Sequence, residues 1–487
     1  MRLVRGFDGL LSGPRLSAIV AAMAAHPTNQ ENRLAVINVV GLCGAHLRSG
    51  HMPRLVAFAA RGGSASFKPT FPALTCSAQS TFLTGGGPGH HGIVGNGWYD
   101  RESAEVRFWK QPDMLVKGEK IWHKLRQSRP EATTAKTFWW YNMYSEVEYS
   151  MTPRPLYPAD GRKIFDIHTE PPDWRFAVQR EDALGPFPFR HFWGPAAGIE
   201  SSAWIADAAR WTEERESPTL QLVYLPHLDY PLQAHGPGWA GIPSELEKID
   251  NVVGDLVDFF DSRGVQVVVL SEYGISAVHR DVALNRVLRR EGWLRVKDEL
   301  GLETLDAGAS AAFAVADHQI AHVYVNRPAI REAVREVLAS CEGVAAVLAP
   351  EELGWAPGTT AAARAGDWIA VADPGTWFSY YYWVDDARAP DFARTVDIHR
   401  KPGYDPAELF IDPQIRFPKL KIASFLLRKK LGLRGLLEVV PIDGRLVRGS
   451  HGLDSVPEEE RPVYLGTNAS RVSRDTDVCD ALLEMMV

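Results

Sequence analysis

Apolar and polar positions along the chain follow two periods, and together they predict strands followed by helices. Residues 34–42 (LAVINVVGL), 221–226 (QLVYLP) and 265–270 (VQVVVL) are short apolar runs rich in β-branched side chains, as in buried parallel strands. Residues 243–262 instead place apolar side chains at helical spacing, opposite a face rich in Asp and Glu. Strand 221–226, helix 243–262 and strand 265–270 therefore form a predicted βαβ unit. This alternation indicates an α/β fold with a mostly parallel sheet and polar groups at the carboxyl ends of its strands.

Two stretches interrupt this pattern. Residues 98–215 are rich in Trp, Arg and Pro and show little periodicity, while residues 291–439 hold a second set of helices and strands. Insertions of this kind commonly cover a site at the carboxyl edge of a sheet and select its substrate. We expect a first insertion over the site at 98–215 and a second insertion or cap at 291–439. The expected units are an N-terminal extension (1–32), an α/β core (33–290 and 440–487) and these two insertions.

Composition narrows the class of protein. The 487 residues are 45% hydrophobic, with 53 Lys+Arg against 60 Asp+Glu and a formal net charge of −7. The apolar content excludes disorder, and the mild acidity argues against a binder of nucleic-acid polymers. No run of about 18 uncharged apolar residues exists, so we expect no membrane-spanning helix.

The cysteines and the N-terminus bear on the compartment. Four cysteines without CxxC spacing indicate reduced thiols in a cytoplasmic protein (Cys43, Cys76, Cys341 and Cys479). The short apolar run 16–25 is expected to form a surface helix, with a signal peptide, and hence secretion, as the open alternative.

The segment 71–97 (FPALTCSAQSTFLTGGGPGHHGIVGNG) holds the most informative chemistry. It places Thr75 where an extended stretch enters a helix, followed by a glycine-rich turn. The free amides and dipole at a helix N-terminus stabilise an anionic nucleophile or a bound phosphate. Taken alone, Thr75 fits a structural helix cap beside that turn better than a nucleophile.

The pattern around Thr75 resembles the nucleotide pyrophosphatase/phosphodiesterase family and the related phosphonoacetate hydrolases of the alkaline phosphatase superfamily. Their nucleophilic threonine is followed by a Thr-Gly pair, a proline and a His-Gly-Ile segment. This chain keeps that order and spacing in Thr75, Thr84-Gly85, Pro88 and His91-Gly92-Ile93. The resemblance implies Thr75 as the nucleophile and Asn96, just after this segment, as a substrate-binding donor to a phosphoryl oxygen. The implied fold is an alkaline-phosphatase-like α/β core, with a mostly parallel central sheet between helices and inserted cap elements.

The resemblance also implies metal ligands. Residues 447–466 (VRGSHGLDSVPEEERPVYLG) look like the family's Gly-Thr-His-Gly segment, whose histidine binds metal, which points to His451. Asp229 matches a metal-binding aspartate, but Gln233 stands where the family has a histidine four residues later.

Two further ligand positions depart from the family. Glu272-Tyr273 replaces an Asp-His pair, and Val40 replaces the aspartate of the first strand, where Asn38 is the nearest polar residue on the same face. The predicted metal set is therefore Asn38, Asp229, Gln233, Glu272 and His451. Such an oxygen-rich set suits harder ions than a zinc pair, so we expect one or two divalent ions (Zn, Mn or Mg), with the loss of one ion as a hypothesis.

The function implied is metal-dependent hydrolysis of a phosphodiester, pyrophosphate or phosphonate bond through a phospho-threonine enzyme. The expected partner is a small phosphorylated or phosphonate substrate. One alternative is a diverged, non-catalytic or weakly active member that binds a phosphorylated metabolite, and another is a phosphotransferase or mutase. A sulfatase is rejected because Cys76 is one residue off the nucleophile position and no Arg follows it in the required place.

Several polar and aromatic groups could have either a functional or a structural role. His279, His318 and His322 are candidates to assist a leaving group, although 313–325 predicts a turn and strand in which the last two are structural. His399 and Lys401 lie in a loop that could contact an anion. The aromatic run 377–383 (WFSYYYW) could stack on a planar substrate, but its alternation favours a half-buried strand. Three cations after Asn96 could hold a distal phosphate or simply solvate a hairpin (Arg101, Arg107 and Lys110).

Overall fold

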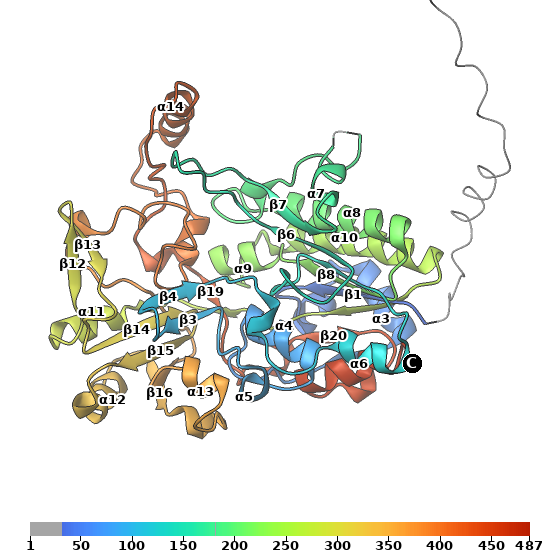
Figure 1. Cartoon of the computed structure of the whole chain (residues 1–487), viewed down its shortest axis with the longest axis horizontal. Helices are drawn as coiled ribbons and strands as arrows, with labels where there is room; N and C mark the ends of the chain where they lie inside the picture. Colours follow the sequence, from blue (N-terminus) through green and yellow to red (C-terminus); the bar gives the residue numbers. More distant parts are fainter. Residues whose placement is uncertain (1–31, 181) are drawn as a thin grey trace, which may run out of the picture.

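A computed structural model describes residues 32–180 and 182–487, so the helix expected at 16–25 and all but the last residue of the expected N-terminal extension lie outside it. Its centre is an eight-stranded sheet (Figure 1). The five inner strands run parallel, and antiparallel strands complete both edges. The order across the sheet is β2 (Ser64–Ser66), β20 (Val463–Leu465), β9 (Gln266–Leu270), β1 (Leu34–Val39), β8 (Leu220–Leu225), β5 (Thr134–Thr137), β6 (Tyr149–Pro153) and β7 (Ile167–Glu170).

Helices cover both faces of this sheet, which confirms the predicted α/β class. Successive side chains of β1 enter opposite layers: Leu34 and Val36 pack with one helix layer, and Ala35, Ile37 and Val39 with the other. A strand buried on both faces needs apolar residues at every position, which is why 34–39 reads as a continuous apolar run. One layer contains α3 (Pro53–Gly62), α8 (Ile199–Glu216) and α10 (Ile242–Ser262), and the other contains α4 (Thr75–Thr84), α6 (Ile121–Ser128) and α15 (Val478–Leu483).

The predicted βαβ unit is confirmed as β8, α10 and β9. The two strands are not neighbours, because β1 lies between them and pairs in parallel with both. Asn38 is in register with Tyr224 of β8 and Leu270 of β9. The carboxyl ends of these three strands are therefore level, and the residues that follow them meet at one edge of the sheet.

The segment 98–215 differs from the expected insertion, because it supplies β5, β6 and β7 to the central sheet and α8 to its cover. These strands lack an apolar run. In β5, the buried Lys136 donates to the carbonyl of Tyr141 at 2.6 Å and lies 3.6 Å from Asp113. A polar strand stabilised by such local partners gives no periodic signal in the sequence.

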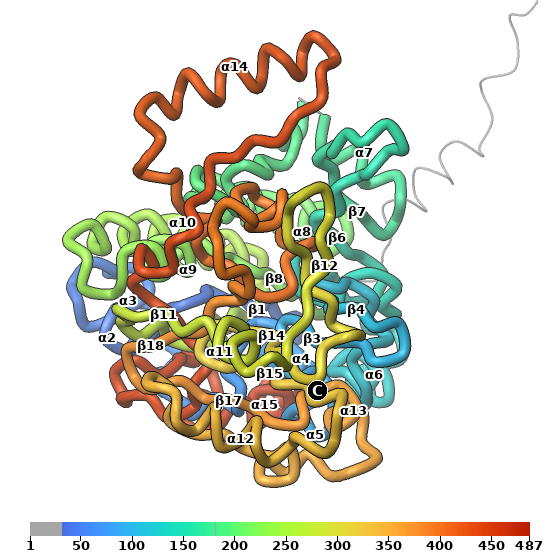
Figure 2. The backbone as a smooth tube through the Cα atoms, turned by 90° about the vertical axis from the view of Figure 1, so that its left-hand side faces the viewer, coloured from blue at the N-terminus to red at the C-terminus, as the bar shows by residue number. Residues whose placement is uncertain are grey.

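The segment 291–439 forms a second lobe with a hydrophobic core of its own. It contains an antiparallel sheet ordered β14 (Ala312–Asp317), β15 (Ile320–Val325), β17 (Trp368–Ala372) and β16 (Val344–Leu348). The aromatic run 377–383 is buried in this lobe, so its rings form core rather than a surface for stacking a substrate. Figure 2 shows α14 (Pro418–Lys430) projecting from the body of the molecule.

The remaining elements are short. The helices are α2 (Gly44–Arg48), α5 (Pro88–His91), α7 (Trp174–Ala177), α9 (Asp229–His235), α11 (Leu284–Arg290), α12 (Arg331–Ala339) and α13 (Thr360–Arg364). The strands are β3 (Gly97–Asp100), β4 (Glu105–Phe108), β10 (Ser276–Ala277), β11 (Arg280–Val282), β12 (Val296–Glu299), β13 (Leu302–Leu305), β18 (Thr376–Phe378) and β19 (Gly449–Ser450). The four cysteines, all within the described residues, are free thiols, as expected. No helix among residues 32–180 and 182–487 is long and apolar enough to cross a membrane.

Candidate active site

The sequence-predicted site residues converge at the carboxyl edge of the central sheet. Thr75 is the first residue of α4 and Asp229 the first of α9, just after β8. Glu272 follows β9 by two residues, and His451 follows β19. Asn38 and Asn96 complete the set, and all of these side chains are buried. The sheet topology thus brings together residues separated by more than 400 positions along the chain.

Thr75 lies at the N-terminus of α4, where the helix dipole would stabilise an anionic nucleophile. The cap of α4 is Leu74, so Thr75 is not a capping threonine, and its hydroxyl is free to act elsewhere. The Thr75 Oγ1 lies 2.8 Å from the hydroxyl of Tyr273. The next backbone amide, that of Cys76, donates to Oδ1 of Asn96 at 3.0 Å. Thr75 and Asn96 therefore both lie at the first turn of α4, at the positive end of the helix dipole.

Asp317, from the second lobe, fixes the orientation of Asn96. Its carboxylate accepts the backbone N–H of Asn96 at 2.7 Å and the side-chain Nδ2–H at 3.1 Å. Burial raises the pKa of Asp317 to about 6. Sequence reasoning missed this residue, although its place at the end of a strand, directly before His318, is the signal that could have indicated it.

Asp229 and His451 face each other on one side of Thr75. His451 Nδ1 lies 2.9 Å from the carbonyl of Ala73, which assigns the proton to Nδ1 and leaves a lone pair on Nε2. Gln233 donates to Oδ2 of Asp229 at 2.7 Å and accepts from the hydroxyl of Tyr404 at 2.9 Å. Asp229 Oδ1 and His451 Nε2 are 4.0 Å apart, and both are buried with no hydrogen-bond partner in the described chain.

Burial sets the protonation on this side of the site. It lowers the pKa of His451 well below its usual value, so the imidazole is neutral at physiological pH. It raises the pKa of Asp229 to about 7, against hydrogen bonds from Gln233 and Tyr273 that favour the carboxylate. A neutral imidazole beside a carboxyl group that ionises near neutrality is a donor pair for a cation.

Asn38 and Glu272 form a second group of buried polar side chains in the site. The amides of Asn38 and Gln79 both donate to Oε1 of Glu272, at 2.6 and 2.5 Å. Burial nevertheless raises the pKa of Glu272 to about 8, so the carboxyl group is mostly protonated at neutral pH. Gln79 comes from α4, one helical turn after Thr75, and was not predicted.

Four rings stack across the site. Tyr273 lies parallel to His451, with centroids 3.6 Å apart and an interplanar angle of 8°. His318 packs 3.8 Å from His451, and Tyr404 packs 3.6 Å from His318. Both additional rings come from the second lobe, so the lobe completes the site as well as covering it. His318 therefore belongs to the site, whereas the sequence favoured a structural role for it.

These residues fit one cation better than two. Among the described residues no group of three or more His, Cys, Asp and Glu side chains could hold a metal ion. The orphaned atoms of Asp229 and His451, beside the amide of Gln233, nevertheless offer two donors to a single ion. The Asn38–Glu272 group also has unpartnered oxygens in the described chain, Asn38 Oδ1 and Glu272 Oε2, but it lacks an imidazole, because Tyr273 stands where the family resemblance expects one.

The other candidates lie elsewhere or are already engaged. His322 lies 3.0 Å from the carbonyl of Val94 and accepts from the amide of Gly366, the structural role that was expected. Lys401 is buried between Asp405 at 2.7 Å and Glu408 at 2.6 Å, so its charge is neutralised within the protein. Arg101 and Arg107 form ion pairs with Asp367 and Asp100, and Lys110, His279 and His399 are exposed.

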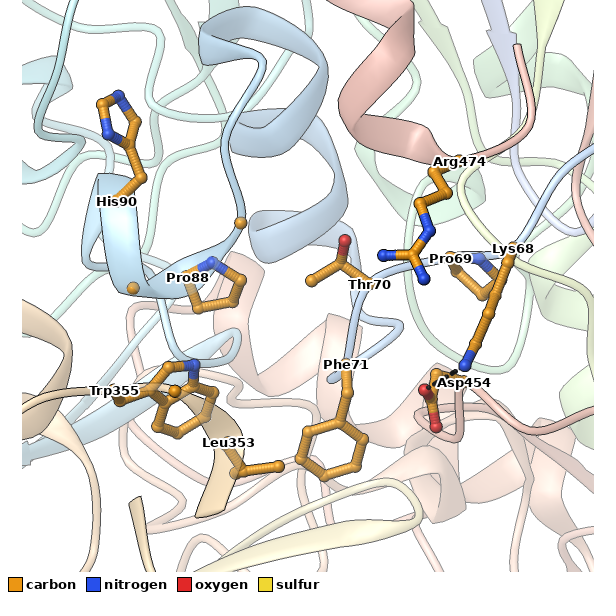
Figure 3. A pocket seen from close by; sticks show the side chains of 13 residues that line it. Lys68, Pro69, Thr70, Phe71, Pro88, His90, Leu353, Trp355, Asp454 and Arg474 are labelled. Carbon is orange, nitrogen blue, oxygen red and sulfur yellow. Dashed lines mark ion pairs between the residues drawn. The ribbon is translucent and has the colours of Figure 1, made fainter. Parts of the chain in front are cut away.

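A pocket of about 320 Å³ adjoins the segments that carry Thr75 and His451 (Figure 3). Phe71 lines it four residues before Thr75, and Asp454 three residues after His451. Trp355 contributes a wall from the second lobe, and Lys68 pairs with Asp454 at 3.1 Å. The pocket therefore lies at the junction of core and lobe, outside the buried site itself.

The comparisons with known proteins agree with this geometry. Residues 34–405 match the family described as type I phosphodiesterase / nucleotide pyrophosphatase. An uncharacterised pyrophosphatase/phosphodiesterase of Schizosaccharomyces pombe is 25% identical over 259 residues, which is 50% of this chain and 45% of that protein. This chain thus spans less than half the length of the curated relative it matches.

Solved structures share the fold. Murine ectonucleotide pyrophosphatase/phosphodiesterase 5, in an inactive form in complex with AMP, superposes with a TM-score of 0.56 at 15% identity, covering 94% of this chain and 95% of that one. Phosphonoacetate hydrolase from Sinorhizobium meliloti, in complex with phosphonoformate, gives a TM-score of 0.57 at 15% identity, covering 93% and 96%. The expected fold and resemblance are confirmed, and the chain belongs to the type I phosphodiesterase / nucleotide pyrophosphatase family of hydrolases.

Proposed function

We propose that this protein hydrolyses a phosphodiester, pyrophosphate or phosphonate bond in a small substrate, with Thr75 as the nucleophile. The observation that carries the proposal is the arrangement around Thr75. Its hydroxyl lies at the N-terminus of α4, 2.8 Å from that of Tyr273, and the next backbone amide donates to Asn96. The AMP and phosphonoformate bound by the two structural relatives support a small phosphorylated or phosphonate substrate.

Thr75 and its neighbours have distinct tasks in such a reaction. Attack by the Thr75 oxygen on phosphorus would release the first product and leave a phospho-threonine, which water then hydrolyses. Tyr273 would orient the Thr75 hydroxyl through their 2.8 Å contact. Burial raises the pKa of the Tyr273 phenol, so Tyr273 stays protonated and the Thr75 proton would pass to solvent as the oxygen attacks. Asn96, held by Asp317, and the amides of the first turn of α4 face the charge that develops on the phosphoryl oxygens. The murine relative is inactive as a Thr-to-Ala variant, which supports a threonine nucleophile in this fold.

Asp229 and His451 are the residues that would hold one divalent cation, and Gln233 would orient the Asp229 carboxylate through its side-chain amide. A bound ion would polarise a phosphoryl oxygen and favour the ionised form of the nucleophile. The mixture of one imidazole with oxygen donors is compatible with Zn, Mn or Mg. Ion pairing with Asp229 would also compensate a carboxylate that burial alone makes unfavourable.

A specific observation favours the alternative of a weakly active or non-catalytic member. Gln233 and Tyr273 stand where the family resemblance expects imidazoles, so the site offers fewer metal ligands than the resemblance implies. Under this alternative the site would bind a phosphorylated metabolite without turnover. The phosphotransferase alternative differs only in the acceptor and would appear as transfer to an added alcohol.

One experiment separates these possibilities. Metal content is measured on the purified protein, and hydrolysis of bis(p-nitrophenyl) phosphate is followed with added Mn²⁺, Mg²⁺ or Zn²⁺. We expect metal-stimulated turnover that Thr75→Ala abolishes. Thr84→Ala is the matched control, because Thr84 is equally buried at the other end of α4 and only bonds the backbone. Binding of AMP without turnover under every ion would favour the non-catalytic alternative.

A further inference from the structure

The segment 414–437, here called the basic arm, consists of α14 and the irregular segments before and after it, 414–417 and 431–437. Figures 1 and 2 show α14 standing away from both the central sheet and the second lobe. All thirteen residues of α14 are described, and none of them is buried. A helix of this length gains little stability from its backbone alone, so an apolar face that no described residue covers points to a binding partner.

The composition of the basic arm contrasts with the rest of the protein. It contains seven cations and no acidic residue (Arg416, Lys419, Lys421, Arg428, Lys429, Lys430 and Arg434). The whole chain has a net charge of −7, so the chain without the arm carries −14. Eleven of its residues are Leu, Ile or Phe. Strong positive charge and exposed apolar side chains are thus concentrated in one projecting element of an acidic protein.

The cations of α14 flank an exposed leucine stripe. At about 100° per residue, Leu427 and Leu431 lie within about 20° of Leu420 around the helix axis. These three side chains are 68%, 59% and 69% exposed, in the order Leu420, Leu427 and Leu431. On the same wheel, Lys419 and Lys430 lie roughly 80–100° to one side of the stripe, and Lys421 and Arg428 equally far on the other. Half-buried Ile422 and Phe425 point toward the opposite face.

A second projecting loop extends this surface. Residues 154–166 form a hairpin-like loop closed by a bridge between Leu156 and Ile164, and Arg434 of the basic arm lies against Gly161 at its tip. Tyr157 and Phe165 are 54% and 56% exposed, and the ammonium group of Lys163 lies 5.9 Å from each ring. Aromatic rings next to lysines are typical of residues that sit at the boundary between water and lipid headgroups.

We propose that the basic arm and this loop dock the protein on an anionic membrane surface. The leucine stripe would lie among the acyl chains at the interface, while the flanking lysines and arginines extend to lipid phosphates on both sides. Clusters of four to eight Lys and Arg residues on such a helix bind acidic lipids. The helix lies on the surface and does not span it, in agreement with the absence of a spanning helix among the described residues.

Charge decides between a membrane and other occupants. A second copy of the arm would place seven cations against seven, so self-association through this surface is opposed electrostatically. An acidic protein could neutralise the cations, but it would have to supply apolar contacts both for the leucine stripe of α14 and for the aromatic rings of the 154–166 loop. A bilayer supplies both requirements over any area, and the −14 charge of the remaining chain would orient the arm toward an anionic surface.

The test uses the full-length protein and vesicles sedimented from solution. We expect binding to vesicles of phosphatidylcholine with added phosphatidylglycerol, little binding to phosphatidylcholine alone, and loss of binding at high salt. The double variants Leu420→Asp/Leu427→Asp and Lys421→Glu/Arg428→Glu should each reduce binding by about tenfold or more. Because α14 contributes no buried residue, both variants should keep the fold and the hydrolase activity on soluble substrates.

The matched control is Leu300→Asp, since Leu300 is also exposed, at a turn outside the surface. It should bind vesicles as the wild type does. Failure of the wild type to bind anionic vesicles at low salt would overturn the proposal, as would equal binding by the α14 variants. Size-exclusion chromatography with light scattering would reveal a dimer that the same variants dissociate, and that result would also overturn it.

Discussion

The buried ion triad of Lys401, Asp405 and Glu408 allows a prediction about the free energy of unfolding. The ammonium group lies 2.7 Å from Asp405 and 2.6 Å from Glu408, and all three side chains are buried. Replacing Lys401 by Met leaves two carboxylates without their cation. Breaking such a buried pair destabilises a protein by about 3–5 kcal/mol. Glu408 keeps donors from Trp193 and Asp397, so we expect the lower half of that range.

The assay is urea unfolding of wild type and Lys401→Met at neutral and mildly acidic pH. Burial already raises the pKa of Glu408 and Lys401 opposes that rise, so in the variant the Glu408 pKa should lie further above that of the unfolded chain. A raised carboxyl pKa destabilises the folded state increasingly as pH rises, so the deficit should shrink as pH falls toward the unfolded values of about 4. Lys401→Met combined with Asp405→Asn and Glu408→Gln is the neutral control and should recover most of the loss. A deficit under about 1 kcal/mol, or one independent of pH, would refute the reasoning.

Three further predictions follow from single contacts. Tyr273→Phe removes the hydroxyl beside Thr75 and should lower turnover about tenfold or more, whereas Tyr380→Phe, which removes a buried hydroxyl with no partner in the described chain, should leave it unchanged. Gly274→Ala would place a Cβ against the carbonyl oxygen of Glu460 and should destabilise the fold by about 1–3 kcal/mol. Gly238→Ala, with no described atom within 4 Å of the added Cβ, should leave the thermal unfolding temperature unchanged. Burial lowers the pKa of His91 to about 3, so the unfolded chain binds its proton more tightly and stability falls as pH drops below the unfolded value. At about pH 5 this amounts to about 2 kcal/mol, and His91→Gln should lose that part of the pH dependence in urea titrations.

The sequence predicted the central strands because strands buried on both faces are apolar at nearly every position, which is visible as a continuous apolar run. β1, β8 and β9 are apolar at nearly every position, and α10 is apolar on one face only. β5 to β7 lack such an apolar run, since β5 places the buried, polar Lys136 and two threonines where β1 has apolar side chains. Those strands were therefore expected to belong to an insertion.

The candidate site was predictable where its motif is local and unpredictable where two lobes meet. Thr75 and Asn96 lie within one short segment, and the order of the segments placed Asp229 and His451 near them. Asp317, His318 and Tyr404 reach the site only through the packing of the second lobe. The contact between Asn38 and Glu272 also depended on geometry, because the sequence does not show that the amide of Asn38 donates to the Glu272 carboxyl group.

The most direct test of the central claim is capture of the phosphorylated enzyme. The protein is mixed with bis(p-nitrophenyl) phosphate and metal, quenched in acid during turnover, digested and analysed by mass spectrometry. The account predicts a phosphorylated or nitrophenyl-phosphorylated peptide modified at Thr75, present in wild type and Thr84→Ala and absent in Thr75→Ala. Turnover with no modified Thr75 peptide, or equal turnover in Thr75→Ala, would contradict it.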